Sequence, residues 1–100
     1  LLHGEAIAVG MICETHLSWQ KRMISNDELI DITLYLLAVF GHVPLQQKDK
    51  SIIFKLMSQD KKNVAGKINF SLLNGVGKCD INIECSKKEQ EQAFSYYCEL

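Results

Sequence analysis

The segment Leu2–Met11, with the sequence LHGEAIAVGM, decides how the rest of the chain is interpreted, because it places a histidine and a glutamate at the start of an apolar run. The alanines of this run favour a helix, and Gly10 is the exception. We therefore expect His3 near a helix N-terminus, where backbone amides and the helix dipole favour a negative group such as Glu5 or an anionic ligand. A neutral imidazole is a common metal ligand, which makes His3 the first candidate functional residue.

The composition is that of one folded domain. The chain has 100 residues, a mass of 11.3 kDa and 47% hydrophobic residues, enough to bury a modest core. Its net charge of −1 provides no electrostatic footprint for nucleic acid or an anionic membrane. The apolar run Ala6–Cys13 is far shorter than the roughly 20 residues of a membrane span, and no basic segment precedes it. We expect neither nucleic acid nor membrane as a partner.

The spacing of the cysteines indicates a protein of a reducing environment. Cys13, Cys79, Cys85 and Cys98 form no C-x-x-C pair, so neither a zinc ribbon nor a thioredoxin-type site is indicated. Scattered free thiols are typical of cytosolic proteins. The expected location is therefore the cytoplasm.

Two long helices are expected first. Ile7, Met11 and Leu17 alternate with charged residues over His3–Met23, which predicts an amphipathic helix, and Gly10 leaves a shallow spot where a neighbouring helix could approach closely. A second apolar run follows the capping-box pattern S-x-x-E of Ser25 and Glu28. It predicts a helix over Asn26–Phe40, buried on a wide face, that stops at Gly41 and is followed by Pro44.

The second half of the chain should add a short helix and a hairpin. Ser51 is expected to cap a helix over Ile52–Gln59. Lys67–Leu72 and Cys79–Cys85 each alternate polar and apolar residues, and turn residues 74–77 separate them, which predicts a β-hairpin.

A second capping box, Ser86 with Glu89, predicts a last helix that ends at about Cys98. Four helices and one hairpin give a mainly α fold class, a helical bundle-like domain with one small β-hairpin. We expect residues 1–100 to form this single domain.

Two sequence motifs carry a resemblance to a known family. The segment Leu2–Met11 resembles the HGEA-(V/I)-A-x-GM segment of 3-dehydroquinate synthases, which opens their helical C-terminal domain. Further on, Asp60-Lys61-Lys62, Gly66–Leu73 and Gly75–Lys78 resemble the family's DKK…GK(L/I)xFxLLxxIGK segment, in the same order. The chain begins inside the first motif and lacks an initiator methionine, so we expect a fragment of a longer protein whose N-terminal NAD-binding domain is absent from this chain.

The resemblance implies an activity and its cofactors. The intact enzyme would convert 3-deoxy-arabino-heptulosonate 7-phosphate to 3-dehydroquinate plus phosphate in the shikimate pathway, with zinc or cobalt and a recycled NAD as cofactors. It would be a phosphate-eliminating lyase and a homodimer, and its small-molecule partner would be the sugar phosphate. The fragment alone should be inactive.

The resemblance also implies two site residues. His3 matches one of three zinc ligands, and the other two, a glutamate and a histidine, would lie in the parts of the protein outside this chain. Lys61 matches the lysine of the DKK loop that contacts substrate, and we expect it to bind the phosphate, for which an ammonium is a suitable point charge. No catalytic or NAD-binding residue is expected within the 100 residues.

The other candidate residues have plainer interpretations. Glu5 is expected mainly to cap the first turn, with orientation of His3 as the alternative. His16 and His42 lack metal partners at helical spacing and are taken as surface or structural residues. The glycines of Gly75–Lys78 lack the spacing of a phosphate loop and indicate a turn.

Two further functions stay open. One is a sister sugar phosphate cyclase, such as an epi-valiolone or deoxy-inosose synthase, which shares the HGEA segment and the cofactors but acts on a different sugar phosphate. The other is a helical interaction module without catalytic activity.

Overall fold

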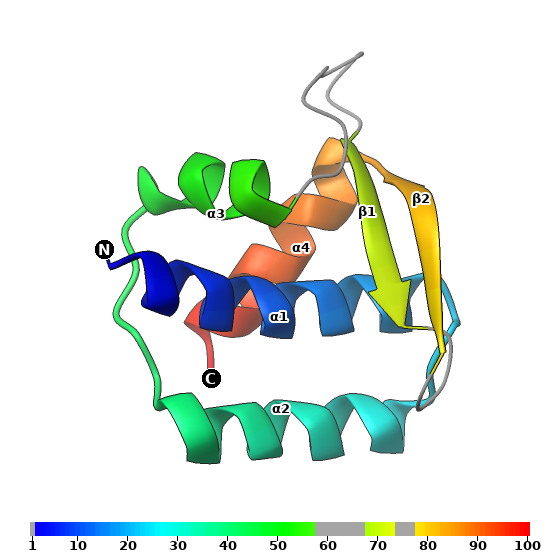
Figure 1. The fold of residues 1–100 in the computed structure, drawn as a ribbon, viewed down its shortest axis with the longest axis horizontal. Coiled ribbons are helices and arrows are strands. Elements are labelled where there is room, and N and C mark those ends of the chain that lie inside the picture. Colours follow the sequence, from blue (N-terminus) through cyan, green and yellow to red (C-terminus); the bar gives the residue numbers. More distant parts are fainter. Residues whose placement is uncertain (1, 58–67, 74–77) are drawn as a thin grey trace.

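The computed structural model describes residues 2–57, 68–73 and 78–100 of the chain. Helix α1 (His3–Gln20) is followed by α2 (Asn26–Phe40) and α3 (Asp49–Met57), then by strands β1 (Ile68–Leu73) and β2 (Cys79–Cys85), and finally by α4 (Lys87–Cys98) (Figure 1). The expected fold class, mainly α with one small hairpin, is confirmed.

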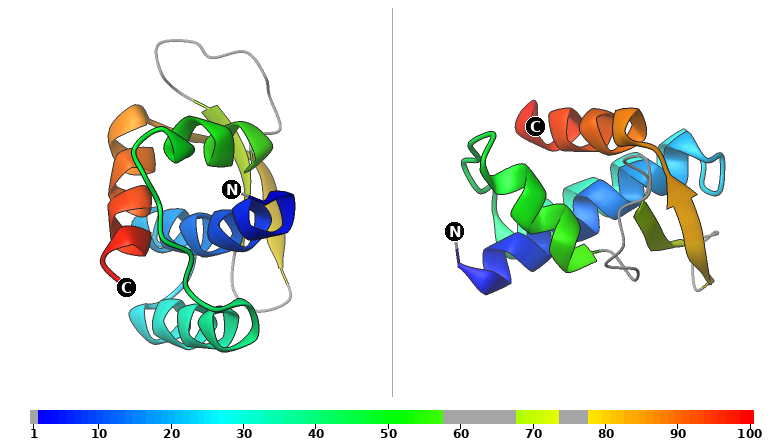
Figure 2. Two further views of the ribbon diagram at one scale, coloured as in Figure 1. Left: turned by 90° about the vertical axis from the view of Figure 1, so that its left-hand side faces the viewer. Right: turned by 90° about the horizontal axis from the view of Figure 1, so that it is seen from above.

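Helix α1 is the central element, and the other elements are arranged around it. The end-on view in Figure 2 shows α3, α4 and α2 on successive sides of α1, and α1 also contacts β1. Burial therefore extends around much of the helix, including Val9, Cys13 and Leu17. The prediction of an amphipathic helix was wrong in this respect, because Ile7 and Met11, assigned to its apolar side, are exposed.

Local hydrogen bonds define both ends of α1. Glu5 Oε1 accepts a hydrogen bond from the Leu2 backbone N–H at 2.9 Å and closes the first turn. At the other end, Arg22 has φ of 60° and donates to the Trp19 carbonyl, while the N–H of Met23 donates to the Ser18 carbonyl. This pair of bonds is a Schellman motif. It ends α1 before Met23, the end that the sequence had predicted.

Helix α2 has the predicted bounds and the predicted cap. The Glu28 N–H donates to Ser25 Oγ at 3.1 Å, and Glu28 Oε1 accepts from the Ser25 N–H at 2.9 Å. Gly41 ends the helix with φ of 76°, a conformation that glycine adopts without steric cost. The expected wide buried face is narrow, because the helix buries one row of side chains and exposes apolar residues on its remaining surface: Ile30, Leu34, Tyr35, Val39 and Phe40.

Helix α3 begins earlier than predicted. Ser51 lies inside the helix, and the turn before it is closed by Asp49, whose Oδ2 accepts from the Gln46 N–H at 2.9 Å. The expected close approach at Gly10 is confirmed, because a Cβ built there would lie 2.8 Å from Met57 Cγ. The predicted C-terminal end at Gln59 lies outside the described residues.

The hairpin and α4 complete the core. Strands β1 and β2 pair antiparallel, with Ile68 opposite Cys85 and Leu73 opposite Cys79, and the register shifts between Phe70 and Leu72. The predicted turn at residues 74–77 lies outside the described residues. Helix α4 has the predicted bounds and its capping box, and it buries apolar and aromatic side chains against α1 and α3: Ala93, Phe94 and Tyr97. None of the described helices is long and apolar enough to span a membrane.

Candidate functional site

His3 is the first residue of α1, and its side chain is exposed. The structure records no hydrogen bond or ion pair of its imidazole to any described residue. An imidazole held on a helix and open to solvent can offer a ring nitrogen to a ligand. The exposed ring of His3 is therefore not held in place by a hydrogen bond to a described residue.

The Glu5 side chain interacts with the start of α1 rather than with His3. Positions two apart on an α-helix point about 200° apart around its axis, so His3 and Glu5 lie on nearly opposite sides of α1. The recorded hydrogen bond of the Glu5 carboxylate is to the Leu2 N–H. The expectation that Glu5 mainly caps the first turn is confirmed.

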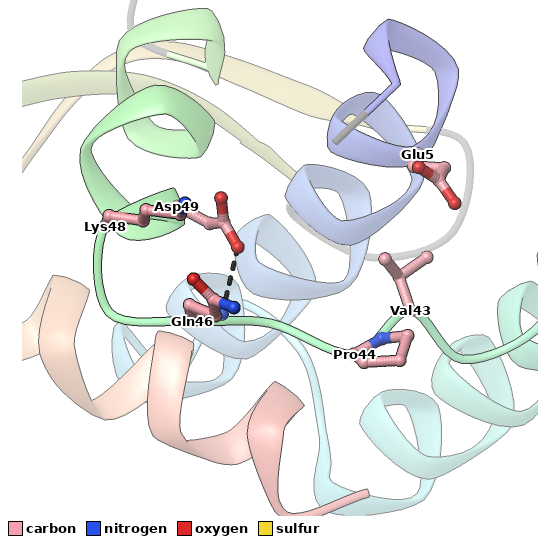
Figure 3. Close-up of a pocket in the computed structure, with 6 residues that line it drawn as sticks. All are labelled: Glu5, Val43, Pro44, Gln46, Lys48 and Asp49. Carbon is pink, nitrogen blue, oxygen red and sulfur yellow. Dashed lines mark hydrogen bonds between the residues drawn. The ribbon is translucent and has the colours of Figure 1, made fainter.

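A hollow of about 290 Å³ lies beside Glu5, between the first turn of α1 and the segment that leads into α3 (Figure 3). Its lining includes Val43, Pro44 and two carboxylates, those of Glu5 and Asp49, with Lys48 at its edge. Two carboxylates disfavour a phosphate or a carboxylate ligand. The hollow also adjoins the Glu5 side of α1, away from His3, so it does not extend the candidate metal site.

The second candidate, Lys61, lies outside the described residues, as do Asp60 and Lys62. Within the described parts of the chain, no three metal-binding side chains come together. A catalytic zinc site typically uses three protein ligands and leaves a fourth position open. Through His3 these residues can supply one ligand to a metal site, and the others must come from elsewhere.

His16 is structural, as expected. It is 7% exposed, its ring stacks on Tyr96 with centroids 4.5 Å apart, and burial lowers its pKa. Gln20 Nε2 lies 2.9 Å from His16 Nδ1 and donates to the Glu89 carbonyl at 2.9 Å. The pair joins α1 to α4, and a neutral ring suits this role because its Nδ1 then accepts the Gln20 proton.

His42 also acts in the structure. Its Nε2 donates to the Tyr97 carbonyl at 3.1 Å, and the two rings stack with centroids 4.8 Å apart. The Tyr97 hydroxyl in turn accepts from the Val43 N–H at 2.8 Å. These contacts fasten the segment after α2 to the end of α4.

The cysteines do not form a reactive group. All four are free, as predicted. Cys13 and Cys85 are buried, and burial raises the pKa of both thiols, that of Cys85 to about 12. A thiol that stays protonated at neutral pH is a poor nucleophile.

Comparison with known proteins places the sequence of this mainly α domain among the C-terminal domains of an enzyme family. The family profile described as 3-dehydroquinate synthase C-terminal matches residues 1–63. The chain is 31% identical over 99% of its length to a 3-dehydroquinate synthase of Parabacteroides distasonis. It is 33% identical to the enzymes of that name from Thermodesulfovibrio yellowstonii, over 94% of the chain, and Rhodopseudomonas palustris, over 81%. No solved structure matches the chain.

The chain therefore belongs to the 3-dehydroquinate synthase C-terminal family. It spans 28%, 26% and 24% of the length of these three relatives. About three quarters of the sequence that the relatives contain has no counterpart in these 100 residues. The three relatives carry the name of an enzyme.

One feature of the surface around His3 was not predicted from the sequence. Ile7 and Met11 follow it at positions i+4 and i+8, and they are exposed by 46% and 39%. The positions of apolar residues in the sequence could not show this exposure. Whether a side chain of α1 is buried depends on which sides of the helix the later elements cover. The i, i+4, i+8 spacing was nevertheless visible in the sequence.

Proposed function

We propose that this chain is a C-terminal part of a 3-dehydroquinate synthase, which converts 3-deoxy-arabino-heptulosonate 7-phosphate to 3-dehydroquinate and phosphate in the shikimate pathway. Membership of the family carries the proposal, because the match includes the LHGEAIAVGM segment with His3. The 100 residues alone should be inactive, since they span only 28%, 26% and 24% of the length of the three relatives named above. Zinc, or cobalt in its place, would act as a Lewis acid, and NAD as a hydride acceptor that is regenerated.

His3 would be the contribution of this chain to the metal site. Its imidazole is exposed and has no recorded partner among the described residues, so binding a metal would break no contact within them. Its backbone is fixed by the first turn of α1, which Glu5 closes. A ligand on a capped helix is better positioned than one on a loop.

Lys61 would bind the phosphate of the sugar substrate. The proposal rests on its place in the DKK segment and on the suitability of an ammonium for a phosphate oxygen. We further propose that the full-length protein is a cytoplasmic homodimer. Four free thiols agree with a reducing compartment.

The decisive experiment measures phosphate release from the heptulosonate phosphate by full-length protein with zinc and NAD, for the native sequence and for His3→Ala. Loss of a zinc ligand should lower the zinc content well below one per chain and reduce kcat at least 100-fold. His42→Ala is the matched control, because it removes an imidazole that stacks on Tyr97. Full zinc occupancy and activity in His3→Ala would contradict the assignment of His3.

The same assay separates the alternatives. Native protein that binds zinc and NAD but does not turn over this substrate would indicate a sister cyclase, such as an epi-valiolone or deoxy-inosose synthase. Native protein that binds neither cofactor would indicate an interaction module without catalytic activity.

A further inference from the structure

The C-terminal end of α3 packs on the side of α1 that carries His3. Gly10 follows His3 by seven residues, which is two helical turns less about 20°, so the two positions face the same side of α1 about 10 Å apart along its axis. Met57, the last residue of α3, lies over Gly10, and Figures 1 and 2 show α3 over the N-terminal half of α1. The end of α3 is therefore fixed about two turns from His3.

The contact between the two helices leaves no room for a side chain at position 10. A Cβ built on Gly10 would lie 2.8 Å from Met57 Cγ and 3.1 Å from its Sδ. The same atom would lie 4.0 Å from Cγ2 of Ile53, which is fully buried one turn earlier on α3. Any larger residue at position 10 must displace Met57 or the end of α3. The distance between α1 and α3 at this point thus depends on a glycine.

The two helices lead to the two proposed site residues. His3 begins α1, and Lys61 follows Met57 by four residues in the sequence. Lys61 lies outside the described residues. A segment of four residues spans at most about 14 Å, so the place where α3 ends limits the region that Lys61 can reach. A sugar phosphate held at both residues would therefore depend on how α3 sits on α1.

We propose that Gly10 and Met57 are positioning residues for the sugar phosphate, because their contact sets the place where α3 ends relative to His3. The inference rests on the proposed function, since it takes Lys61 to bind the phosphate. Neither positioning residue touches the substrate. They act through the segment that follows α3, and a displacement of about 1 Å in such a support can change the rate of an enzyme about 100-fold.

Gly10→Ala in the full-length protein tests this role. The added methyl group should displace the end of α3 and raise KM for the heptulosonate phosphate roughly 5-fold or more, with a smaller change in kcat, because a phosphate contact binds substrate and transition state alike. The Kd of inorganic phosphate, measured by isothermal titration calorimetry, should rise by a similar factor. A loss of stability alone would lower the amount of active enzyme and leave both constants unchanged.

Ile12→Val is the matched control. Ile12 is buried on α1 nine residues after His3, on the opposite side of the helix, and removing one carbon atom there should cost about as much stability as Gly10→Ala. Its KM and phosphate Kd should equal those of the native protein.

Two further variants change the same contact from α3. Met57→Ala in the Gly10→Ala background makes room for the new methyl group and should return both constants to within about 2-fold of the native values. Met57→Phe adds bulk at the contact and should raise both constants, which provides a second test if Gly10→Ala does not fold.

Unchanged KM and phosphate Kd in folded Gly10→Ala would overturn the proposal, as would an equal increase in Ile12→Val. In a Lys61→Gln background Gly10→Ala should weaken phosphate binding less than about 2-fold, and an undiminished effect would overturn the link to Lys61. Native protein that does not turn over the heptulosonate phosphate, or Lys61→Gln that binds phosphate like the native protein, would contradict the proposed function and this inference with it.

Discussion

At the scale of single residues, Glu14 is the acidic side chain in which burial most clearly opposes ionisation. It lies between the buried Cys13 and Thr15 on α1, and burial raises its pKa from 4.5 to about 7. In the unfolded chain the carboxyl ionises near its ordinary pKa. The folded chain therefore holds a proton between about pH 4.5 and 7 that the unfolded chain has released.

This difference predicts the sign of the pH dependence. The contribution of Glu14 to stability is full below pH 4.5, decreases as the pH rises towards 7, and is lost above that value. Glu14→Gln removes the ionisable group. The free energy of unfolding of this variant, relative to that of the native sequence, should therefore increase by about 3 kcal/mol between pH 4 and pH 8. Urea titrations at the two pH values measure this, with the exposed Glu99→Gln as control. An equal difference at both pH values would disprove the role of burial.

At the scale of elements, the sequence predicted most accurately the features that depend on residues close together in the chain. The capping boxes Ser25/Glu28 and Ser86/Glu89 fix the starts of α2 and α4, and both formed as predicted because their hydrogen bonds span only three residues. The start of α3 was misplaced at Ser51, because any serine before an apolar run looks like a cap.

Burial was harder to predict than helix formation. The spacing of apolar residues in α1 fits a helix equally well whether one side or several sides are covered. Which sides are covered depends on contacts with residues later in the chain, such as Leu72 on β1 and Ala93 on α4. The spacing alone therefore could not show that Ile7 and Met11 would be exposed. The same limit applies to the candidate site, where the resemblance pointed to His3 but not to the exposed Ile7 and Met11 that follow it on the helix.

The packing of α1 on α3 makes a testable element-scale prediction at Gly10. An added Cβ would lie 2.8 Å from Met57 Cγ and 3.1 Å from its Sδ, so Gly10→Ala should displace that side chain. The gain in helix propensity of about 1 kcal/mol opposes an overpacking cost of about 1–3 kcal/mol. We expect a net loss of about 1 kcal/mol in thermal or urea denaturation.

A double-mutant cycle tests the cause. Met57→Ala removes the side chain that the new methyl group meets, so Gly10→Ala should be neutral or stabilising in that background. The same loss in both backgrounds would show that Gly10 is needed for a reason other than the contact with Met57.

At the scale of the whole molecule, compact size and exposed apolar surface occur together. The described chain has a radius of gyration of 12.4 Å, close to the roughly 13 Å of a compact domain of 100 residues. It nevertheless exposes many large apolar side chains: Leu2, Ile7, Met11, Trp19, Ile30, Leu34, Tyr35, Val39, Phe40, Ile52, Leu56 and Leu100. A loose fold therefore does not account for the exposure. Surface of this extent is typical of a unit that packs against other parts of a protein.

A substitution at Gly4 can test whether another part of the protein packs on this surface. It introduces no charge and leaves His3 unchanged. In the described structure a Cβ at Gly4 meets no atom within 4 Å, so the 100-residue domain has room for a larger side chain there. If another part of the full-length protein lies on the side of α1 that exposes Ile7 and Met11, Gly4→Leu would force it away. We expect full-length Gly4→Leu to lose about 1–3 kcal/mol of stability, with a smaller effect for Gly4→Ala.

The control places the same leucine on an exposed position elsewhere, Ser51→Leu on α3. Changes at exposed positions usually alter stability by no more than about 0.5 kcal/mol, so this variant should unfold like the native protein. Thermal denaturation of the full-length variants measures the difference. If Gly4→Leu unfolded like Ser51→Leu, the open side of α1 would face solvent in the full-length protein.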